Sequence, residues 1–182
     1  MKSLKISLVF MAYMLWANYG AQAQTASSTS TAVIVQPISI YSFGSVLNFG
    51  AFTPDPLNPS TLTLTPESST SASKDYASNL ILHEYSDRAA GSFYVEGAPG
   101  AAFIVSLPES ATLTNENTDT MTVTDFTVAE AYTFYDEFES TNVFNIDDDG
   151  ELPILVAGTL NIGAAQPSGN YSGNYLVTVN YQ

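Results

Sequence analysis

The feature that most restricts the fold of this chain is an alternation of apolar and polar residues with a period of two. It is clearest at the C-terminal end, where Tyr175, Val177, Val179 and Tyr181 would share one face of a segment. In a β-strand successive side chains point to opposite sides, so this period predicts strands. No window has the 3.6-residue period of an amphipathic helix. The predicted strands are residues 32–40, 46–52, 61–65, 79–85, 92–96, 102–107, 120–128, 132–139, 154–162 and 174–181.

Segments rich in Gly, Pro, Asn, Asp and Ser separate these stretches, as in "TPDPLNPS", "GAPG", "TNENTD", "DDDG" and "AQPSG". Short strands at such spacing predict an all-β fold, an antiparallel immunoglobulin-like β-sandwich of about ten short strands. Residues 66–78 have no alternation, and we expect a loop there.

The first 23 residues predict a secretory signal peptide. Lys2 and Lys5 precede the apolar run "ISLVFMAYMLWA", and "AQA" ending at Ala23 supplies small residues for cleavage. The run is too short for a membrane span, and no later segment is long and apolar enough for a transmembrane helix. We therefore expect a signal peptide at 1–23, a flexible polar leader at 24–31 and a single β-sandwich domain at 32–182.

Charge and cysteine content exclude several functions. After cleavage, the basic side chains would be Lys74 and Arg88, against 18 acidic residues. Such a chain repels nucleic acid and anionic membrane surfaces. There is no cysteine, so disulfides, zinc–thiolate sites and thiol catalysis are excluded. A domain of this size can instead be stable by burial alone.

Four blocks of sequence resemble a known bacterial family: "LNFGAF", "GSFYVEGAPGAAFIVSLP", "TMTVTDF" and the closing "LVAGTLNIGAAQPSGNYSGNYLVTVNYQ". In this order they resemble domain of unknown function 4402, a family of secreted, cysteine-free β proteins. The ending is similar, more loosely, to spore coat U subunits and chaperone–usher pilins. The resemblance implies a secreted or surface β-sandwich and carries no catalytic residues. The "AQAQ" signal end resembles those of Bacteroidetes proteins, which implies the extracellular space, cell surface or periplasm of a Gram-negative bacterium.

The sharpest local signal is "NIDDDGE" at Asn145–Glu151. Asn145, Asp147 and Asp149 occupy the first, third and fifth positions of a calcium loop, and Glu151 is close by. The twelfth position is Val156, where a bidentate Glu belongs, so this is no EF-hand. Asp-Gly between apolar residues also predicts a hairpin turn, and the two interpretations are compatible. We expect no cofactor other than a weakly bound calcium ion.

Evidence for catalysis is weak. His83 is the sole histidine, with Glu84 and Asp87 nearby in sequence, but the nucleophile elbow G-x-S-x-G is absent. Asp136, Glu137 and Glu139 could serve glycoside hydrolysis only with a distant partner, and a solvated acidic face is the simpler interpretation. The tyrosines occupy core-like alternating positions, which favours packing over sugar binding.

We therefore expect a non-enzymatic structural or adhesive surface protein, with an unidentified surface partner or self-assembly. The alternatives are a pilin-like subunit assembled by donor-strand exchange and a weak calcium- or glycan-binding module. A donor-strand subunit lacks one strand of its own, and here "QTASSTST" is a poor donor and Pro37 interrupts the next predicted strand. We expect the terminal strand to complete its own sheet in a chain that folds alone as a monomer.

Overall fold

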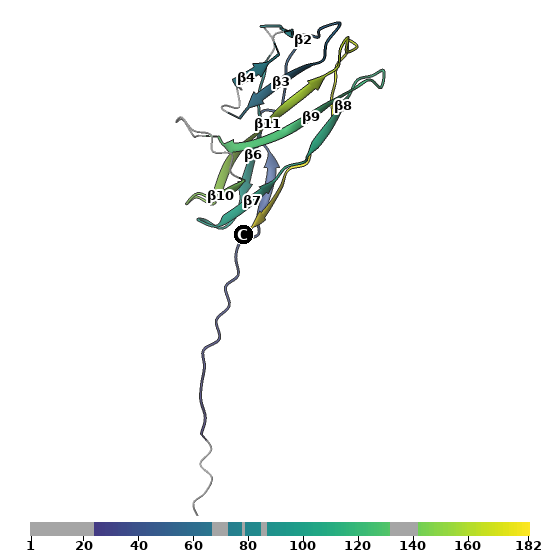
Figure 1. Ribbon diagram of the computed structural model, residues 1–182. Helices are drawn as coiled ribbons and strands as arrows, with labels where there is room; N and C mark the ends of the chain where they lie inside the picture. Colours follow the sequence, from purple (N-terminus) through teal and green to yellow (C-terminus); the bar gives the residue numbers. More distant parts are fainter. Residues whose placement is uncertain (1–23, 67–72, 78, 85–86, 132–141) are drawn as a thin grey trace, which may run out of the picture. The chain divides into compact units, whose positions relative to one another are not determined.

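The computed structural model describes residues 24–66, 73–77, 79–84, 87–131 and 142–182, and only the backbone of residues 73–75. The chain divides into two units, residues 1–34 and residues 35–182, and each is considered by itself. In the first unit, the described residues 24–34 belong to no strand and are exposed. The second unit contains the strands labelled in Figure 1.

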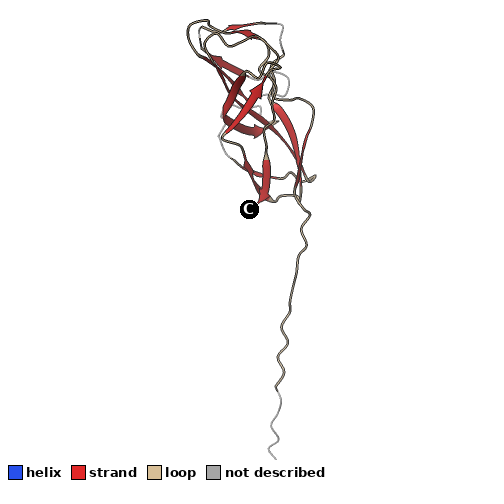
Figure 2. Cartoon of the chain, turned by 90° about the vertical axis from the view of Figure 1, so that its right-hand side faces the viewer, coloured by secondary structure: helices blue, strands red, loops and turns tan. Residues whose placement is uncertain are grey.

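The described strands form three antiparallel sheets. The largest has seven strands, namely β1 (Ser39–Ser42), β3 (Ser60–Thr65), β4 (Ser73–Tyr76), β6 (Gly91–Glu96), β8 (Ser110–Thr114), β9 (Thr120–Glu130) and β11 (Glu151–Ile162). A three-stranded sheet has the order β10 (Val143–Asn145), β7 (Ala102–Ser106), β12 (Thr178–Tyr181). β2 (Phe52–Thr53) and β5 (Ile81–Leu82) form the third sheet. Figure 2 shows strands and loops in this part of the chain, with no helix drawn. Within the described ranges, no helix is long and apolar enough to cross a membrane.

The strand β11 organises the large sheet. It pairs with β9 along one side, while along the other it pairs first with β6, through Glu151–Val156, and then with β3, through Thr159–Ile162. The sequence "LPILVAGTLNI" is apolar at successive positions, and most of its residues are buried. Such a continuous run is typical of a strand that is covered on both faces.

A β-bulge lies where β11 passes from one half of the sheet to the other. Ala157 pairs with Thr127 and Thr159 with Thr124, so β9 contains one extra residue there. Asp125 in this step has a φ of 49°. A Cβ placed on Gly158 would lie 3.0 Å from the carbonyl oxygen of Thr124. Glycine at this position therefore permits the close approach of the two strands.

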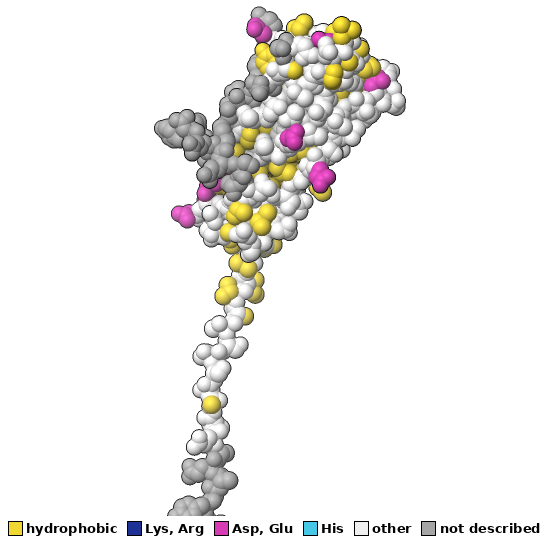
Figure 3. Space-filling view, viewed as in Figure 1, with side chains coloured by type: hydrophobic (Ala, Val, Ile, Leu, Met, Phe, Trp, Pro, Cys, Tyr) yellow, Lys and Arg dark blue, Asp and Glu magenta, His cyan; other side chains and the backbone are white. Residues whose placement is uncertain are grey.

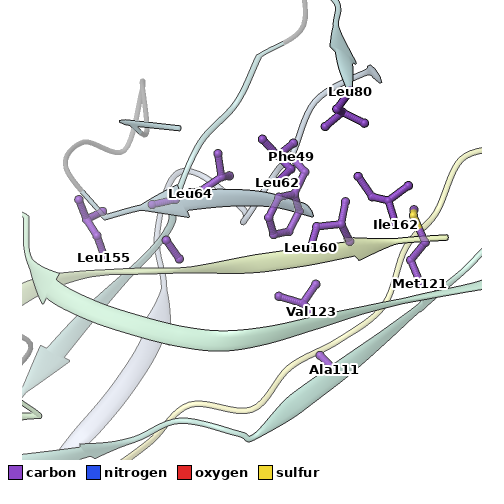
Figure 4. Close-up of a cluster of buried hydrophobic side chains, with 12 residues drawn as sticks. Phe49, Leu62, Leu64, Leu80, Ala111, Met121, Val123, Leu155, Leu160 and Ile162 are labelled. Carbon is purple, nitrogen blue, oxygen red and sulfur yellow. The ribbon is translucent and has the colours of Figure 1, made fainter. Parts of the chain in front are cut away.

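Two groups of buried side chains share β11. The first core lies around β3 and the distal half of β11, and Figure 4 shows Leu62, Leu160 and Val123 close together within it. The second core joins the two larger sheets: Phe103, Val105, Phe144 and Val179 come from the three-stranded sheet, and Val95, Ile154 and Val156 from the seven-stranded one. This facing of two sheets confirms the predicted antiparallel β-sandwich.

Tyr175 and Phe126 connect the two cores. Both pack against each core, and their rings stack with centroids 5.4 Å apart. Phe93 meets the ring of Tyr175 edge-on, at 6.1 Å. Burial raises the pKa of Tyr175 to about 12, because the charged phenolate would lose its hydration. Tyr175 thus acts as a packing residue, as the alternation predicts.

Most predicted strands with strong alternation are confirmed, including those corresponding to β3, β6, β7, β9, β11 and the end of β12. The predicted strand 132–139 lies outside the described residues. β8 and β10 were not predicted, and the loop predicted at 66–78 is wrong at Ser73–Tyr76, which forms β4. β4 pairs with β3, and such a short polar edge strand carries too little alternation to be recognised.

Two predicted strands near the N-terminus are mostly wrong. The strand predicted at 32–40 begins only at Ser39, because Pro37 has no N–H to place in a ladder. Residues 33–35 lie outside every strand. In the segment predicted at 46–52, only an isolated bridge from Asn48 to Ala89 and the first residue of β2 are paired. Phe49 is nevertheless buried, so its apolar character reflects the core and not a strand.

Candidate functional site

The acidic segment Asn145–Glu151 forms a tight turn at one end of the domain. The amide of Gly150, whose φ is 86°, donates a hydrogen bond to the carbonyl of Asp147 at 3.0 Å. The amide of Glu151 donates to Asp149 Oδ1 at 3.3 Å. The three aspartates are exposed, whereas Ile146 is buried in the second core. The predicted Asp-Gly turn is therefore present.

This turn is not a hairpin, and that part of the prediction is wrong. It connects β10, which pairs with β7, to β11, which pairs with β6 and β9. The turn lies against a second one, because Gly97 donates to the carbonyl of Gly150 at 3.0 Å and Gly100 to that of Ile146 at 2.8 Å. The Asp-Gly pair predicts the turn correctly. The strands on either side of it do not pair with each other, because Phe144 and Ile154 belong to different sheets.

The predicted calcium ligands are not gathered into an ion site. Across the residues that the structure describes, no three Asp, Glu or His side chains are close enough to hold one ion together. Asn145 is exposed at the end of β10, on a strand and not in the turn. Weak calcium binding through Asn145, Asp147, Asp149 and Glu151 stays a prediction, and the backbone of the turn already uses one of the Asp149 oxygens.

Glu130 at the end of β9 is a neighbour of this turn that the sequence did not indicate. Its pKa is raised, first by partial burial and second by the negative charge of Asp147. Glu130 is 17 positions before Asp147 in the sequence. Only the pairing of β9 with the start of β11 brings them together, and no short motif encodes that pairing.

His83 and Arg88 make hydrogen bonds near β2 and β5. The ring Nε2 lies 3.0 Å from the hydroxyl of Thr53, and both residues are exposed. The guanidinium of the buried Arg88 donates to the carbonyl of Ala51 at 2.9 Å and to that of His83 at 3.4 Å. Arg88 therefore ties the β2 and β5 segments together. The other carboxylates considered for hydrolysis, Asp136, Glu137 and Glu139, lie outside the described residues.

A shallow groove of about 520 Å³ lies where β3, β9 and β11 end near one another. It contains no charged residue; its polar lining is Ser60, Thr61, Thr120, Thr122, Asn161 and Gln166. The amide of Asn161 donates to Thr124 Oγ1 at 2.9 Å, and that of Gln166 donates to Tyr171 Oη at 2.9 Å. Neutral hydroxyls suit a sugar, but the amides that would bind it are already bonded within the protein.

The outer edge of β12 has outward-directed backbone hydrogen-bonding groups. The backbone amide of Gln182 donates to the carbonyl of Ala102 at 3.1 Å. This bond shows which residues of β12 direct their backbone groups toward β7. In an antiparallel pair, residues one position away direct their N–H and C=O groups to the opposite side. The backbone groups of Val179 and Tyr181 therefore point away from β7, and β12 has no other named strand partner among the described residues.

The inner face of β12 is apolar, and its outer face carries the polar Thr178 and Asn180. Val177 and Val179 point into the second core, where Ile38 and Ile40 of the first-strand region also pack. On the opposite face, Ile104 is 36% exposed and Leu176 is 74% exposed. In the view of Figure 3, acidic side chains are scattered over the domain, and yellow apolar patches lie at both of its ends and in the middle.

The first strand reaches the same end of the sandwich. The hydroxyl of Tyr181 donates to the carbonyl of Gln36 at 2.8 Å and accepts from the amide of Ala98 at 2.7 Å. The C-terminus and the start of the folded domain therefore lie together, as Figures 1 and 2 both show. Upstream of this contact, Val33, Ile34 and Val35 are 87%, 98% and 61% exposed. The sequence analysis predicted one strand over residues 32–40, which joined these exposed residues to β1. Pro37 marks the boundary between them.

Comparison with known proteins identifies one relationship. The family model described as domain of unknown function (DUF4402) matches residues 40–181. No curated protein and no solved structure matches the chain.

Proposed function

The chain belongs to the family described as domain of unknown function (DUF4402), and from this we propose that it is a secreted or cell-surface structural protein that associates through the edge of a β-sheet. The observation that carries the proposal is the outer edge of β12, with outward backbone groups, the buried Val179 on its inner face and the exposed Leu176 just before it on the outer face. An unpaired edge of this kind is a template for another strand.

The distribution of charge supports this assignment. All 18 acidic residues lie between Asp55 and Glu151, so the segments 24–54 and 152–182 contain no charged side chain. Protein chains commonly protect an exposed edge with charged side chains, and this one does not. An uncharged edge in a strongly acidic chain is suited to contact, because elsewhere like charges repel neighbouring copies.

Two ionisable groups, Arg88 and Asp55, have hydrogen bonds that fit a non-enzymatic role. Arg88 bonds to backbone carbonyls, and Asp55 accepts hydrogen bonds from the amides of Leu57 and Asn58 at 2.7 and 2.8 Å. These two bonds lower the pKa of Asp55. Each of these groups is used to hold a loop, which is a structural task.

Assembly by donor-strand exchange is the alternative, and it requires a fold that lacks a strand. Here Val177 and Val179 of the chain itself are only 8% and 9% exposed, and β12 is paired with β7. The second core is therefore covered by the chain's own last strand. This favours a domain that folds alone, as expected from the sequence. The proposed association of folded copies through the β12 edge departs from the monomer expected there.

Two measurements test the proposal. Cell fractionation of the producing bacterium should place the protein outside the cytoplasm, and a chain lacking residues 1–23 should remain inside. Sedimentation velocity of the exported protein should show association that increases with concentration. Recovery of the intact chain from the cytosol would contradict the first half of the proposal, and a monomer at every concentration would contradict the second.

A further inference from the structure

We propose that residues 31–36 of one copy add as a strand to the outer edge of β12 of a second copy. The inference rests on the proposed function and names the partner at that edge. It differs from donor-strand exchange, because the added strand extends a sheet that is already complete. The segment 31–36, "TAVIVQ", is called the tract below.

The tract has side chains that favour a β-strand, but it is not part of a strand in the described structure. Val33, Ile34 and Val35 are all β-branched, which favours the extended conformation. They are largely exposed and lie in no strand. Three consecutive exposed residues of this kind expose apolar area to water, and adding the tract to a sheet would remove that area from water. Pro37 ends the tract, because it has no N–H for the ladder.

The edge of β12 can accept a strand with two apolar faces. In the extended tract, Val33 and Val35 would point to one side and Ile34 to the other. On its inner side β12 carries Val179, which packs in the second core with Ile40, and on its outer side it carries Thr178 and Asn180, with the exposed Leu176 just before the strand. One face of the tract would therefore meet the second core, and the other would lie beside Leu176 and the polar side chains of β12.

A second copy of this chain fits the edge because both contact segments are uncharged. The tract lies within the uncharged stretch 24–54, and β12 within the uncharged stretch 152–182. A foreign strand has no such reason to fit, whereas two copies would approach through the parts of their surfaces that do not repel each other.

The contact would be head-to-tail, since each copy offers one tract and one edge. Heterologous contacts of this type form open chains unless the rotation closes a ring. A strand of six residues buries much less than a standard interface, so each contact should be weak and assembly should depend on concentration.

The test uses the full chain, expressed so that the host exports it, and compares three single variants. Ile34→Asp places a charge in the tract, and Asn180→Lys places one on the exposed face of β12. Leu57→Asp is the matched control, because Leu57 is also apolar and 82% exposed but lies in a loop. All three substitutions are at exposed positions, and unchanged thermal unfolding would show that each variant still folds.

Sedimentation velocity over a concentration series should show association of the unmodified chain and of Leu57→Asp. Ile34→Asp and Asn180→Lys should each associate at least tenfold more weakly. A mixture of these two variants should form dimers, because the first retains its edge and the second retains its tract. Those dimers are not expected to grow into longer chains.

The results separate this inference from the proposed function. Association that survives Ile34→Asp would overturn the inference and leave edge association standing. A monomeric unmodified chain would overturn both. A monomer in which the amides of residues 32–35 are protected from hydrogen exchange would mean that each tract covers an edge within its own copy, which also overturns the inference.

Discussion

Removing the last eight residues, Tyr175–Gln182, should abolish independent folding. The deletion takes away β12 and the Tyr175 ring that joins the two cores. It also leaves the inner face of β7, including the fully buried Phe103, uncovered on one side. The perturbation therefore acts on the second core and on the connection between the cores.

The size of the effect can be worked out from burial. Val177 and Val179 are almost fully buried, and full burial of such a side chain is worth about 1.5–3 kcal/mol. Tyr175 and Tyr181 are partly buried and would add about half as much each. The total is about 5–9 kcal/mol, before the lost ladder bonds are considered. Since domains of this size are stable by about 5–15 kcal/mol, the truncated chain should be largely unfolded.

The measurement is thermal or urea unfolding followed by circular dichroism, on the chain beginning at Gln24. The matched control removes the same number of residues from the other end, Gln24–Thr31, which are exposed and outside every strand. The control should keep its midpoint, while the C-terminal deletion should show no cooperative transition. Native-like stability after the C-terminal deletion would refute the view that β12 completes this domain.

Three further predictions concern single sites. Gly91→Ala should destabilise the domain by about 1–3 kcal/mol in urea unfolding, because a Cβ there would collide with the hydroxyl of Tyr175; wild-type stability would show that Tyr175 moves freely. Burial raises the pKa of Glu130, so its ionisation opposes folding: stability should rise as pH falls through the raised pKa and level off below its ordinary value of 4.5. Glu130→Gln should flatten that slope and stabilise by less than about 1 kcal/mol at neutral pH, and an unchanged slope would exclude Glu130 as its source. Calorimetric titration should find no calcium site tighter than about 10⁻⁵ M, and a submicromolar site would contradict the geometry of the acidic turn.

The fold class was predictable because burial imposes its period on the sequence. β3, with the pattern "STLTLT", alternates between buried and half-exposed positions, and its bounds were predicted to within a residue. The strand predicted at 154–162 is confirmed as the greater part of β11, which begins three residues earlier, at Glu151. β4 and β10 were not predicted, because strands of four and three residues at sheet edges have no alternation long enough to detect.

The candidate sites were less predictable, since they depend on which strands become neighbours. The Asp-Gly turn at Asp149–Gly150 was foreseen from two residues, but its position between two sheets was not. The open edge of β12 could not be predicted, because this needs the strand order of the sheet. β12 pairs with β7 on one side and, in the described part of the chain, with no strand on the other. The exposed tract before Pro37 could have been recognised, because proline removes the N–H that a continuous strand needs.

The position of β11 between both cores has a consequence for how the domain comes apart. Leu155 and Leu160 belong to the first core, and Ile154 and Val156 to the second, on one continuous strand. Neither core can open without exposing part of the other, so β6, β9 and β11 should exchange their amide hydrogens only through global unfolding. The two-stranded β2–β5 sheet has no ladder to β11 and should exchange earlier. In the proposed location outside the cell, such an all-or-none transition would protect the protein from proteases that cleave partly opened states.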